Sequence, residues 1–504
     1  MIYLSNLILQ LLLFILFLLC ILLLLFSLYI LYLRRIKYGH LPGPKVSSFF
    51  KGNFPDIRKA LSKGCSSFEF ILDCHIKYGD IVVIWLFFLP WVNVADPYTI
   101  KAILLVQKFP KDPRFYRECL ETLFGERAMG RSLLTNLNDE QWQHRRSLMN
   151  PAFHRLYLRN LMCHFNSSTD IFLAKLRNVA ENGMYVKMAD EFSLVTLDVI
   201  CKAGFGIDLD VIIDPQSPFI QSYNMILKGV EEAFVNPLHK WDFTSYPRQR
   251  EVIKALRFLR NTGRDTIRRR THTLSNDSKK FQDILDHILS DGRDPRLSEE
   301  DLIDDFVTFF SSGHETTSST LSFCLLELLH NNDVFCNAVQ EIKNVLGAQN
   351  DVTYDDLPKF KYLDYCLKET LRLYPPAPGI IRVTPNNVKL NKYVIPKGTT
   401  ISSSPYVMGR HPQHWANPEG FQPERWRCTN DEGQVSTGVY FPFSLGPRNC
   451  IGQQFAMIES KVILAKFLNT FNVELCRGQT KRIHERGSLQ PLDGVICKLS
   501  IANI

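Results

Sequence analysis

The longest apolar run in the chain lies at its N-terminus, from about residue 7 to residue 33, and it carries no charge. About 20 helical residues are enough to cross the hydrocarbon core of a bilayer. A cleaved signal peptide would have a basic start and a shorter apolar region, whereas here the basic cluster Arg34, Arg35 and Lys37 follows the run. The pattern predicts an uncleaved anchor, and the positive-inside rule places the rest of the chain in the cytoplasm.

The remainder of the chain has mostly helical periodicity, with strand signals near its two ends. The segment 78–97 is rich in β-branched and aromatic residues and predicts a pair of strands. Helical periods follow to about residue 370, and strand signals return at 380–383, 392–401 and 489–499. We therefore expect a mainly α-helical fold with small β-sheets.

No repeat, low-complexity tract or Gly/Ser linker divides this body. Two prolines around a glycine at 42–44 cannot continue a helix and predict a stiff turn. The expected organisation is a membrane anchor at 1–35, a basic and proline-rich hinge at 36–50, and one large domain at 51–504.

Composition narrows the function classes. The net charge of +8 is modest and dispersed, so it argues weakly for acidic partners or anionic lipid and does not indicate nucleic-acid binding. The 13 cysteines are scattered without Cys-x-x-Cys spacing, which disfavours zinc ribbons, thioredoxin-like motifs and c-type haem attachment. An odd cysteine count fits reduced thiols in a cytosol-facing compartment.

One cysteine stands in an unusual context, the loop Phe443-Ser-Leu-Gly446-Pro-Arg448-Asn-Cys450-Ile-Gly452, directly before a helical stretch at 453–467. A helix N-terminus favours the thiolate form, and a thiolate is a good ligand for a soft or borderline metal. With no second cysteine nearby, a four-sulfur site is disfavoured. A lone cysteine is often a buried structural thiol, but the flanking residues favour a metal ligand.

The pattern Phe-x-x-Gly-x-Arg-x-Cys-x-Gly resembles the haem-binding loop of the cytochrome P450 monooxygenases, in which a thiolate ligates the iron. The resemblance implies the cytochrome P450 fold behind an N-terminal transmembrane helix. It also implies haem b as cofactor, with Cys450 as its iron ligand and Phe443, Arg448 and Gly452 beside it.

Two further elements resemble haem-binding positions of this family. Trp142 and Arg146 are four residues apart and share one helix face, although such a pair is also compatible with a surface cation–π contact. The resemblance implies that both contact a haem propionate, and that Arg382 does so as well.

The segment 302–329 predicts a long helix, yet it contains Gly313 among several serines and threonines, a local conflict typical of functional sites. It resembles the family's oxygen-activation motif. That implies a helix that opens over the haem and an acid–alcohol pair, Glu315 and Thr316, that relays protons. A Ser/Thr-rich packing seam is the alternative. Ser312 replaces the usual alanine and is expected to change pocket polarity, while His314 is expected behind the site or on the surface.

Glu369 and Arg372 form an i, i+3 pair, which is usually a weak surface ion pair. The resemblance implies instead a buried network with Arg425 that holds the loop carrying Cys450, where loss of one charge would leave its partners unpaired.

Within the family, the chain resembles the cholesterol 24-hydroxylases most, in the segments 124–127, 258–265, 305–310, 313–316, 441–446, 452–456 and 491–493. Fatty-acid omega-hydroxylases are the nearest alternative, and Ser312 replaces the glutamate that esterifies the haem in many of them. A haem-thiolate isomerase that needs no reductase and a non-catalytic haem protein are further alternatives, disfavoured by Glu315 and Thr316. The family's substrate-pocket positions correspond to Tyr116, Phe124, Phe309, Ser312, Ala377, Ile380 and Leu489.

The electrons must come from a partner, because the chain has no dinucleotide fingerprint or flavin region. We expect an NADPH-dependent flavoprotein reductase in the same endoplasmic reticulum membrane, meeting Arg145 and other basic residues on the Cys450 side. The stretch 219–246, with Phe234, Leu238, Trp241 and Phe243, is expected either to contact lipid and admit an apolar substrate or to pack in the core.

Overall fold

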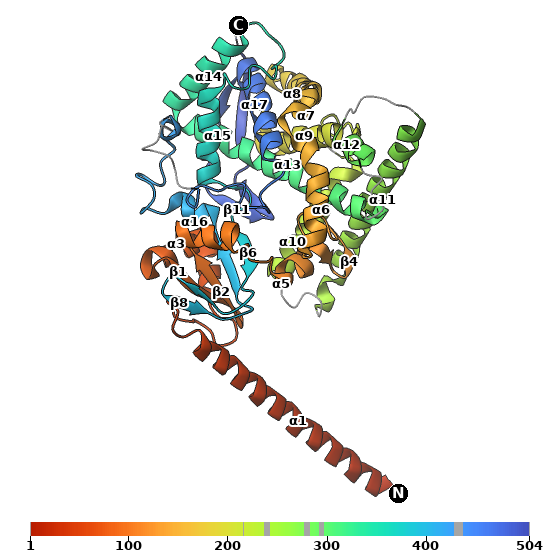
Figure 1. The fold of residues 1–504 in the computed structure, drawn as a ribbon, viewed down its shortest axis with the longest axis vertical. Coiled ribbons are helices and arrows are strands. Elements are labelled where there is room, and N and C mark those ends of the chain that lie inside the picture. Colours follow the sequence, from red (N-terminus) through yellow and green to blue (C-terminus); the bar gives the residue numbers. More distant parts are fainter. Residues whose placement is uncertain are drawn as a thin grey trace.

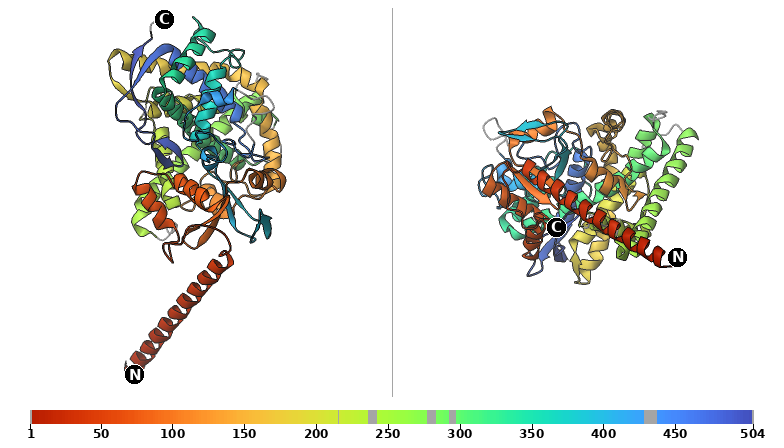
Figure 2. Two further views of the ribbon diagram at one scale, coloured as in Figure 1. Left: turned by 90° about the vertical axis from the view of Figure 1, so that its left-hand side faces the viewer. Right: turned by 90° about the horizontal axis from the view of Figure 1, so that it is seen from below.

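The computed structural model of the chain describes residues 2–214, 216–235, 242–276, 283–291, 297–427 and 437–502. A single long helix, α1 (Ile2–Lys37), projects from a mainly helical body, and the larger β-sheet lies at the end of the body from which α1 emerges (Figure 1). In the left-hand view of Figure 2 α1 again stands clear of the body, whereas in the view from below it runs across the front of the body. The expectation of a mainly α-helical fold with small sheets is confirmed.

Helix α1 has the length and composition to cross a membrane over Ile8–Lys37, and none of its apolar window is buried against the body. The helix extends two residues beyond the predicted anchor boundary. Its end is fastened to the body, because Arg35 donates to the Phe49 carbonyl at 2.7 Å. The predicted hinge that follows also contacts the body. The Pro42 carbonyl accepts from the Val83 amide at 2.8 Å, and at Gly43 a Cβ would lie 2.2 Å from the Val83 carbonyl oxygen.

The largest sheet joins strands from both ends of the chain. It has the order β1 (Ile81–Leu86), β2 (Leu89–Val94), β9 (Thr400–Ser403), β6 (Ile380–Val383), and β2 and β9 are its parallel pair. The predicted strand pair at 78–97 is therefore confirmed. The remaining strands form a three-stranded sheet and short hairpins: β3 (Thr122–Leu123), β4 (Glu126–Arg127), β5 (Tyr185–Lys187), β7 (Val388–Leu390), β8 (Tyr393–Ile395), β10 (Phe471–Leu475), β11 (Ile483–Arg486), β12 (Ser488–Pro491) and β13 (Ile496–Ile501).

The helices surround one long central helix, α13 (Glu299–His330). The α-helices that pack around it or extend the body are α2 (Phe54–Ser62), α3 (Ser67–Tyr78), α4 (Pro97–Lys101), α5 (Pro113–Phe115), α6 (Asp139–Met149), α7 (Arg155–Leu158), α8 (Met162–Glu181), α9 (Met188–Val199), α10 (Pro218–Val235), α11 (Tyr246–Asn276), α12 (Ile284–Asp291), α14 (Asn332–Leu346), α15 (Lys361–Leu373), α16 (Pro405–Arg410) and α17 (Gln453–Thr470). Short π and 3-10 segments are η1 (Ala102–Val106), η2 (Tyr116–Glu121), η3 (Asn150–Phe153), η4 (Arg159–Leu161), η5 (Ile200–Gly204), η7 (Phe243–Ser245) and η8 (Pro423–Trp426).

Helix α13 begins at a capping box in which Ser298 and Asp301 satisfy each other's backbone amides. It is buried along most of its length, and Phe306, Phe310 and Phe323 are almost inaccessible to solvent. A helix buried on nearly all sides has no solvent-exposed face on which polar side chains could lie. Each polar residue along it therefore needs a specific partner or role. Those polar residues define the site described below.

Candidate active site

The loop that carries Cys450 is held by its own backbone. The Cys450 amide donates to the Phe443 carbonyl at 2.9 Å, and Gly446 has a φ of 77°. A side chain at Gly446 would lie 2.3 Å from the Leu104 carbonyl oxygen, so only glycine fits there. Helix α17 starts directly after Gly452. The loop thereby presents the Cys450 side chain to an interior cavity of about 400 Å³ between α13 and α17.

The Cys450 thiol is exposed to this cavity, while the surrounding protein desolvates it. Burial raises the pKa of the thiol, and the Gly452 amide and the Arg146 guanidinium oppose the shift only in part. The Gly452 amide before α17 acts in the predicted direction, toward the thiolate, but burial outweighs it. Coordination to a metal cation deprotonates a thiol directly, so a metal ion bound at Cys450 would offset the cost of ionising this buried thiol.

The same cavity is lined by four basic side chains, Lys111, Arg146, Arg382 and Arg448. Lys111 is buried and donates to the Leu134 carbonyl. Its pKa is lowered well below the usual range by burial first, then by the charges of Arg382 and Arg448. Lys111 and Arg382 are buried and Arg146 and Arg448 are partly buried, and gathering four cations in this way beside a thiol is costly on its own. The set of residues fits a haem, whose iron would be held by the Cys450 thiolate and whose carboxylates would offset the charge of the cations.

Lys111 was absent from the predicted site residues. It precedes α5 in the sequence Phe-Pro-Lys-Asp-Pro, where no periodicity or family motif marks a lysine as interior. Lys111 lies outside the segments that carry the family resemblance.

Trp142 and Arg146 both lie on α6 and both contact the cysteine loop. The Trp142 indole donates to the Leu133 carbonyl at 3.1 Å, and Arg448 covers the indole ring with its Cζ 3.9 Å from the centroid. Arg146 donates to the Asn449 carbonyl at 2.8 Å. The two residues line the cavity and clamp the loop, and the expected propionate contacts are carried forward as a proposal.

Polar residues of α13 form the opposite wall. Ser312, Thr316 and Thr320 line the cavity, and the Thr316 hydroxyl donates to the Ser312 carbonyl at 2.8 Å. The helix is continuously α-helical from Glu299 to His330, which corrects the expectation that it opens here. Gly313 has a packing reason instead, because a Cβ would lie 2.7 Å from Cγ1 of Ile200 in η5.

Glu315 faces away from the cavity that Thr316 lines. Its carboxylate accepts from Ser488 at 2.9 Å and from Tyr223, and it is not among the described residues that line the cavity. His314 is buried against the Tyr223 ring, with the ring centroids 4.3 Å apart. Burial lowers the pKa of His314 to about 4, so this imidazole is neutral and lies behind the site.

The structure brings together most of the predicted pocket residues. Tyr116, Phe309, Ser312, Ala377 and Ile380 line the cavity.

Phe124 and Leu489 do not, which corrects their placement in the pocket. Phe124 occupies a turn with a φ of 52° and packs against Gly229 of α10. Leu489 is buried, and its backbone bonds Pro376 and Ser319.

The predicted contacts around Glu369 are present, with Glu369 and Arg372 fully buried and Arg425 partly buried. Glu369 accepts from Arg372 at 2.8 Å and 3.0 Å, from Arg425 at 2.8 Å and from the Trp426 indole at 3.0 Å. Trp426 packs on Tyr440, with the ring centroids 4.5 Å apart. Since Tyr440 lies just before the cysteine loop, the network connects α15 and η8 to the chain that enters this loop.

Arg145, expected on the surface facing a partner, is buried. It ion-pairs with Asp305 and, at 3.1 Å, with Asp301 of α13. Two adjacent arginines on a helix point in different directions, so Arg146 contacts the cysteine loop while Arg145 contacts α13. Arg145 is therefore unavailable to a partner.

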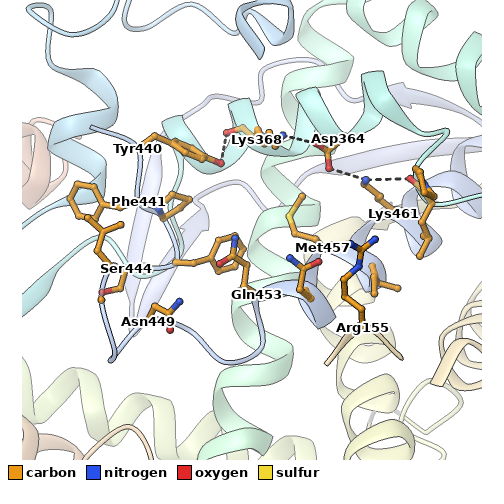
Figure 3. Close-up of a pocket in the computed structure, with 18 of the residues that line it drawn as sticks. Arg155, Asp364, Lys368, Tyr440, Phe441, Ser444, Asn449, Gln453, Met457 and Lys461 are labelled. Atoms are coloured by element: carbon orange, nitrogen blue, oxygen red, sulfur yellow. Dashed lines mark hydrogen bonds and ion pairs between the residues drawn. The ribbon is translucent and has the colours of Figure 1, made fainter. Parts of the chain in front are cut away.

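A second hollow of about 600 Å³ lies on the outer side of the cysteine loop. Figure 3 shows it lined by side chains of α15, α17 and the loop, with Asp364 bound to Lys368 at 2.9 Å and to Lys461 at 2.8 Å. Arg155, which is exposed, stands at its edge. The basic side chains outnumber the acidic one at this face.

The stretch expected to contact lipid is only partly described. Helix α10 covers its first half. Leu238 and Trp241, and the side chains of Phe234 and Phe243, lie outside the described residues.

Comparison with known proteins agrees with this geometry. The family model described as cytochrome P450 matches residues 41–497. Cytochrome P450 3A18 of Rattus norvegicus is 30% identical over 487 residues, covering 91% of this chain and 92% of that protein. Cytochrome P450 3A5 of Homo sapiens is 30% identical over 480 residues, covering 91% of each chain. The family match agrees with the cysteine loop, the four basic side chains and the polar residues of α13 that line one cavity. The chain belongs to the cytochrome P450 family of haem-thiolate monooxygenases.

Proposed function

We propose that the protein is an endoplasmic reticulum monooxygenase, anchored by α1 with its body in the cytosol, that hydroxylates an apolar substrate of the sterol class, as cholesterol 24-hydroxylases do. The reaction consumes one O₂, two electrons and two protons for each R–H converted to R–OH and water. The electrons come from NADPH through a flavoprotein reductase.

The distribution of charge in the cavity carries the proposal. Among the described residues that line it, the basic ones are Lys111, Arg146, Arg382 and Arg448. All four belong to the group of basic side chains that suits the haem carboxylates. A fatty-acid carboxylate deeper in the cavity would be buried without a cation, which is costly. A neutral, rigid and mostly apolar molecule suits the walls that include Phe153, Phe205, Phe309 and Ile380.

When bound, the haem supplies the activation of O₂ at an iron held by the Cys450 thiolate. The chain's own residues do the rest. The four basic side chains orient the cofactor, and the apolar walls exclude water. The Thr316 hydroxyl offers a proton at the cavity wall. Glu315, one residue away on the same helix, is the acid that passes a proton to the Thr316 hydroxyl.

Three of the segments that resemble cholesterol 24-hydroxylases, 124–127, 258–265 and 305–310, meet at one cluster around the buried Asp304. Arg127 and Arg260 both bind Asp304, at 2.6 Å and 2.9 Å, and a Cβ at Gly263 would lie 2.6 Å from the Phe306 ring. These segments therefore specify how α11 packs on α13. They support the resemblance in fold and leave substrate choice to the cavity.

The test is direct competition between substrate classes. Full-length protein is reconstituted with reductase and NADPH in lipid, and cholesterol and a long-chain fatty acid are supplied separately. Mass spectrometry of hydroxylated products identifies the class. Sterol hydroxylation supports the proposal. Exclusive terminal hydroxylation of the fatty acid would replace it with the omega-hydroxylase alternative, and NADPH-independent turnover would support the isomerase alternative.

The relay is tested with Thr316→Ala and its matched control Thr316→Ser, which keeps the hydroxyl. Alanine is expected to lower the ratio of product to NADPH consumed by about 10-fold or more, while serine retains most of it. Unchanged coupling in Thr316→Ala would remove Thr316 from the mechanism. Orientation in the membrane is tested by protease protection of sealed microsomes, where the body is expected to be digested from outside.

A further inference from the structure

The Glu315 carboxylate is bound by hydroxyl groups from two elements distant in sequence. Tyr223 of α10 donates to one carboxylate oxygen, and Ser488 of β12 donates to the other at 2.9 Å. The Tyr223 hydroxyl also lies 3.3 Å from the Ser311 carbonyl. Both oxygens of the acid are thus engaged on the side of α13 that faces away from the Cys450 cavity.

The phenol is fixed by its surroundings. Tyr223 is 6% exposed. Its ring packs edge-on against His314, at a centroid distance of 4.3 Å, and against Phe310, at 6.0 Å. Leu227, one turn further along α10, and Glu315 both approach Gly487 of the β11–β12 hairpin. A change in the position of α10 or of this hairpin would therefore alter the hydrogen bonds of Glu315.

The charged and titratable groups around the acid are few in the described part of the chain. Arg486 at the end of β11 acts on Glu315 from one side, and Tyr223 and Ser488 from the others. His314, on the same helix, is neutral because burial lowers its pKa to about 4. Burial raises the pKa of Glu315, while the two hydroxyls and Arg486 lower it.

We propose that Tyr223 and Ser488 are positioning residues that hold Glu315 out of the cavity and ready it for release when α10 or the β11–β12 hairpin moves. The inference rests on the proposed relay role of Glu315. On release, the carboxylic O–H bond breaks and its proton passes to the Thr316 hydroxyl, which gives up its own proton into the cavity. The carboxylate then takes a proton from a solvent hydronium ion, which leaves water and restores the acid. Proton delivery thereby depends on the position of the elements that pack over the cavity.

The experiment compares Tyr223→Phe, Ser488→Ala and the matched control Ser488→Thr, which keeps the hydroxyl, in the reconstituted holoenzyme. The ratio of product to NADPH is measured from pH 6 to pH 9, with the reduced carbon-monoxide spectrum confirming thiolate-ligated haem in each variant. Because hydroxyl donors stabilise the ionised acid, their removal lets Glu315 stay protonated to higher pH. The falling limb of the profile is expected to move up by about one pH unit in Tyr223→Phe and in Ser488→Ala, and to stay in place in Ser488→Thr.

Glu315→Gln separates the relay role of Glu315 from the positioning role of Tyr223 and Ser488. If Glu315→Gln uncouples turnover and the limb moves as described, the inference stands. If Glu315→Gln uncouples turnover but neither hydroxyl variant moves the limb, Tyr223 and Ser488 are ordinary packing partners, the inference falls and the relay survives. If Glu315→Gln stays fully coupled, the relay role itself is wrong and the inference fails with it.

Discussion

The guanidinium of Arg448 lies over the indole of Trp142, with its Cζ 3.9 Å from the ring centroid. Arg448 also donates to the Asn136 carbonyl at 3.0 Å and pairs with Asp139 at 2.5 Å. One side chain of the cysteine loop thus contacts α6 and the segment before it. This contact fixes the position of the loop two residues before Cys450.

Arg448→Ala is expected to loosen the loop. Loss of a partly buried cation–π contact costs about 1–2 kcal/mol, and the cavity loses one of its four cations. We expect a clearly smaller fraction of purified protein with a thiolate-type reduced carbon-monoxide spectrum, and weaker haem retention on dilution. Arg477→Ala, an exposed arginine on the far loop after β10, is the control and should match the wild type. Equal haem content in both variants would contradict the role given to Arg448.

Glu369→Gln is expected to destabilise the whole body. The substitution leaves the fully buried Arg372 and the partly buried Arg425 around a neutral amide, and breaking a buried ion pair costs about 3–5 kcal/mol. We expect a much lower Tm and loss of haem during purification. Glu424→Gln is the matched control because Glu424 is exposed and bonds only the Tyr362 hydroxyl among its recorded partners, at 2.6 Å. A Tm loss no larger than that of the control would show that the network is dispensable.

Elements with strong local periodicity were predictable from the sequence. Strand β6 coincides with the predicted 380–383, and α13 extends the predicted 302–329 by only a few residues at its start. The reason is physical: a buried helix and a β-branched strand each repeat their apolar residues with one period. The haem-loop residues were also accessible, because loop and helix N-terminus are contiguous in sequence.

Relationships between distant segments were not predictable. Tyr223 and Glu315 are 92 residues apart, and Glu315 and Ser488 are 173 apart. No local pattern records that α10 and β12 converge on one carboxylate. Arg145 failed for a related reason, since its burial depends on Asp301 and Asp305 facing α6. Lys111 likewise depends on where a short connection lies in space.

Gly313→Ala is expected to destabilise through a clash. The new Cβ would lie 2.7 Å from Cγ1 and 2.9 Å from Cδ1 of Ile200, and overpacking of this kind costs about 1–3 kcal/mol. Ile200→Ala removes both atoms, so the double variant should be more stable than the sum of the single effects allows. Thermal unfolding of the four proteins gives the coupling. If the stability losses of the two single variants simply add in the double variant, Gly313→Ala does not act through a clash with Ile200.

Arg155→Glu is expected to impair electron delivery selectively. Arg155 is exposed at the edge of the hollow behind the cysteine loop, where a reductase with an acidic face would approach. Charge reversal at an interface rim lowers mainly the association rate. We expect about 10-fold higher reductase concentration for half-maximal turnover, with peroxide-supported turnover unchanged. An equal loss in both assays would indicate damage to the active site instead.

Glu459 of α17 is a buried acid that the proposed chemistry does not use. It is 0% exposed, and neither carboxyl oxygen has a hydrogen-bond partner among the described residues. Burial raises the pKa of Glu459 well above its usual range, and Thr317 opposes the shift only in part. The folded state therefore keeps the proton over a pH range in which the unfolded chain, with an ordinary pKa of about 4.3, has lost it.

Because the folded state binds more protons in that range, the free energy of unfolding falls as pH rises above about 4.3, until the folded-state pKa is reached. Glu459→Gln mimics the neutral acid and removes this dependence. We expect near-equal Tm values for variant and wild type at pH 5, and a growing advantage for the variant toward pH 8, by up to about 1.4 kcal/mol per pH unit. Glu474→Gln on the exposed face of β10 should leave the wild-type pH dependence unchanged. A difference between Glu459→Gln and wild type that stays constant with pH would mean that the acid finds a charge partner once the haem is bound.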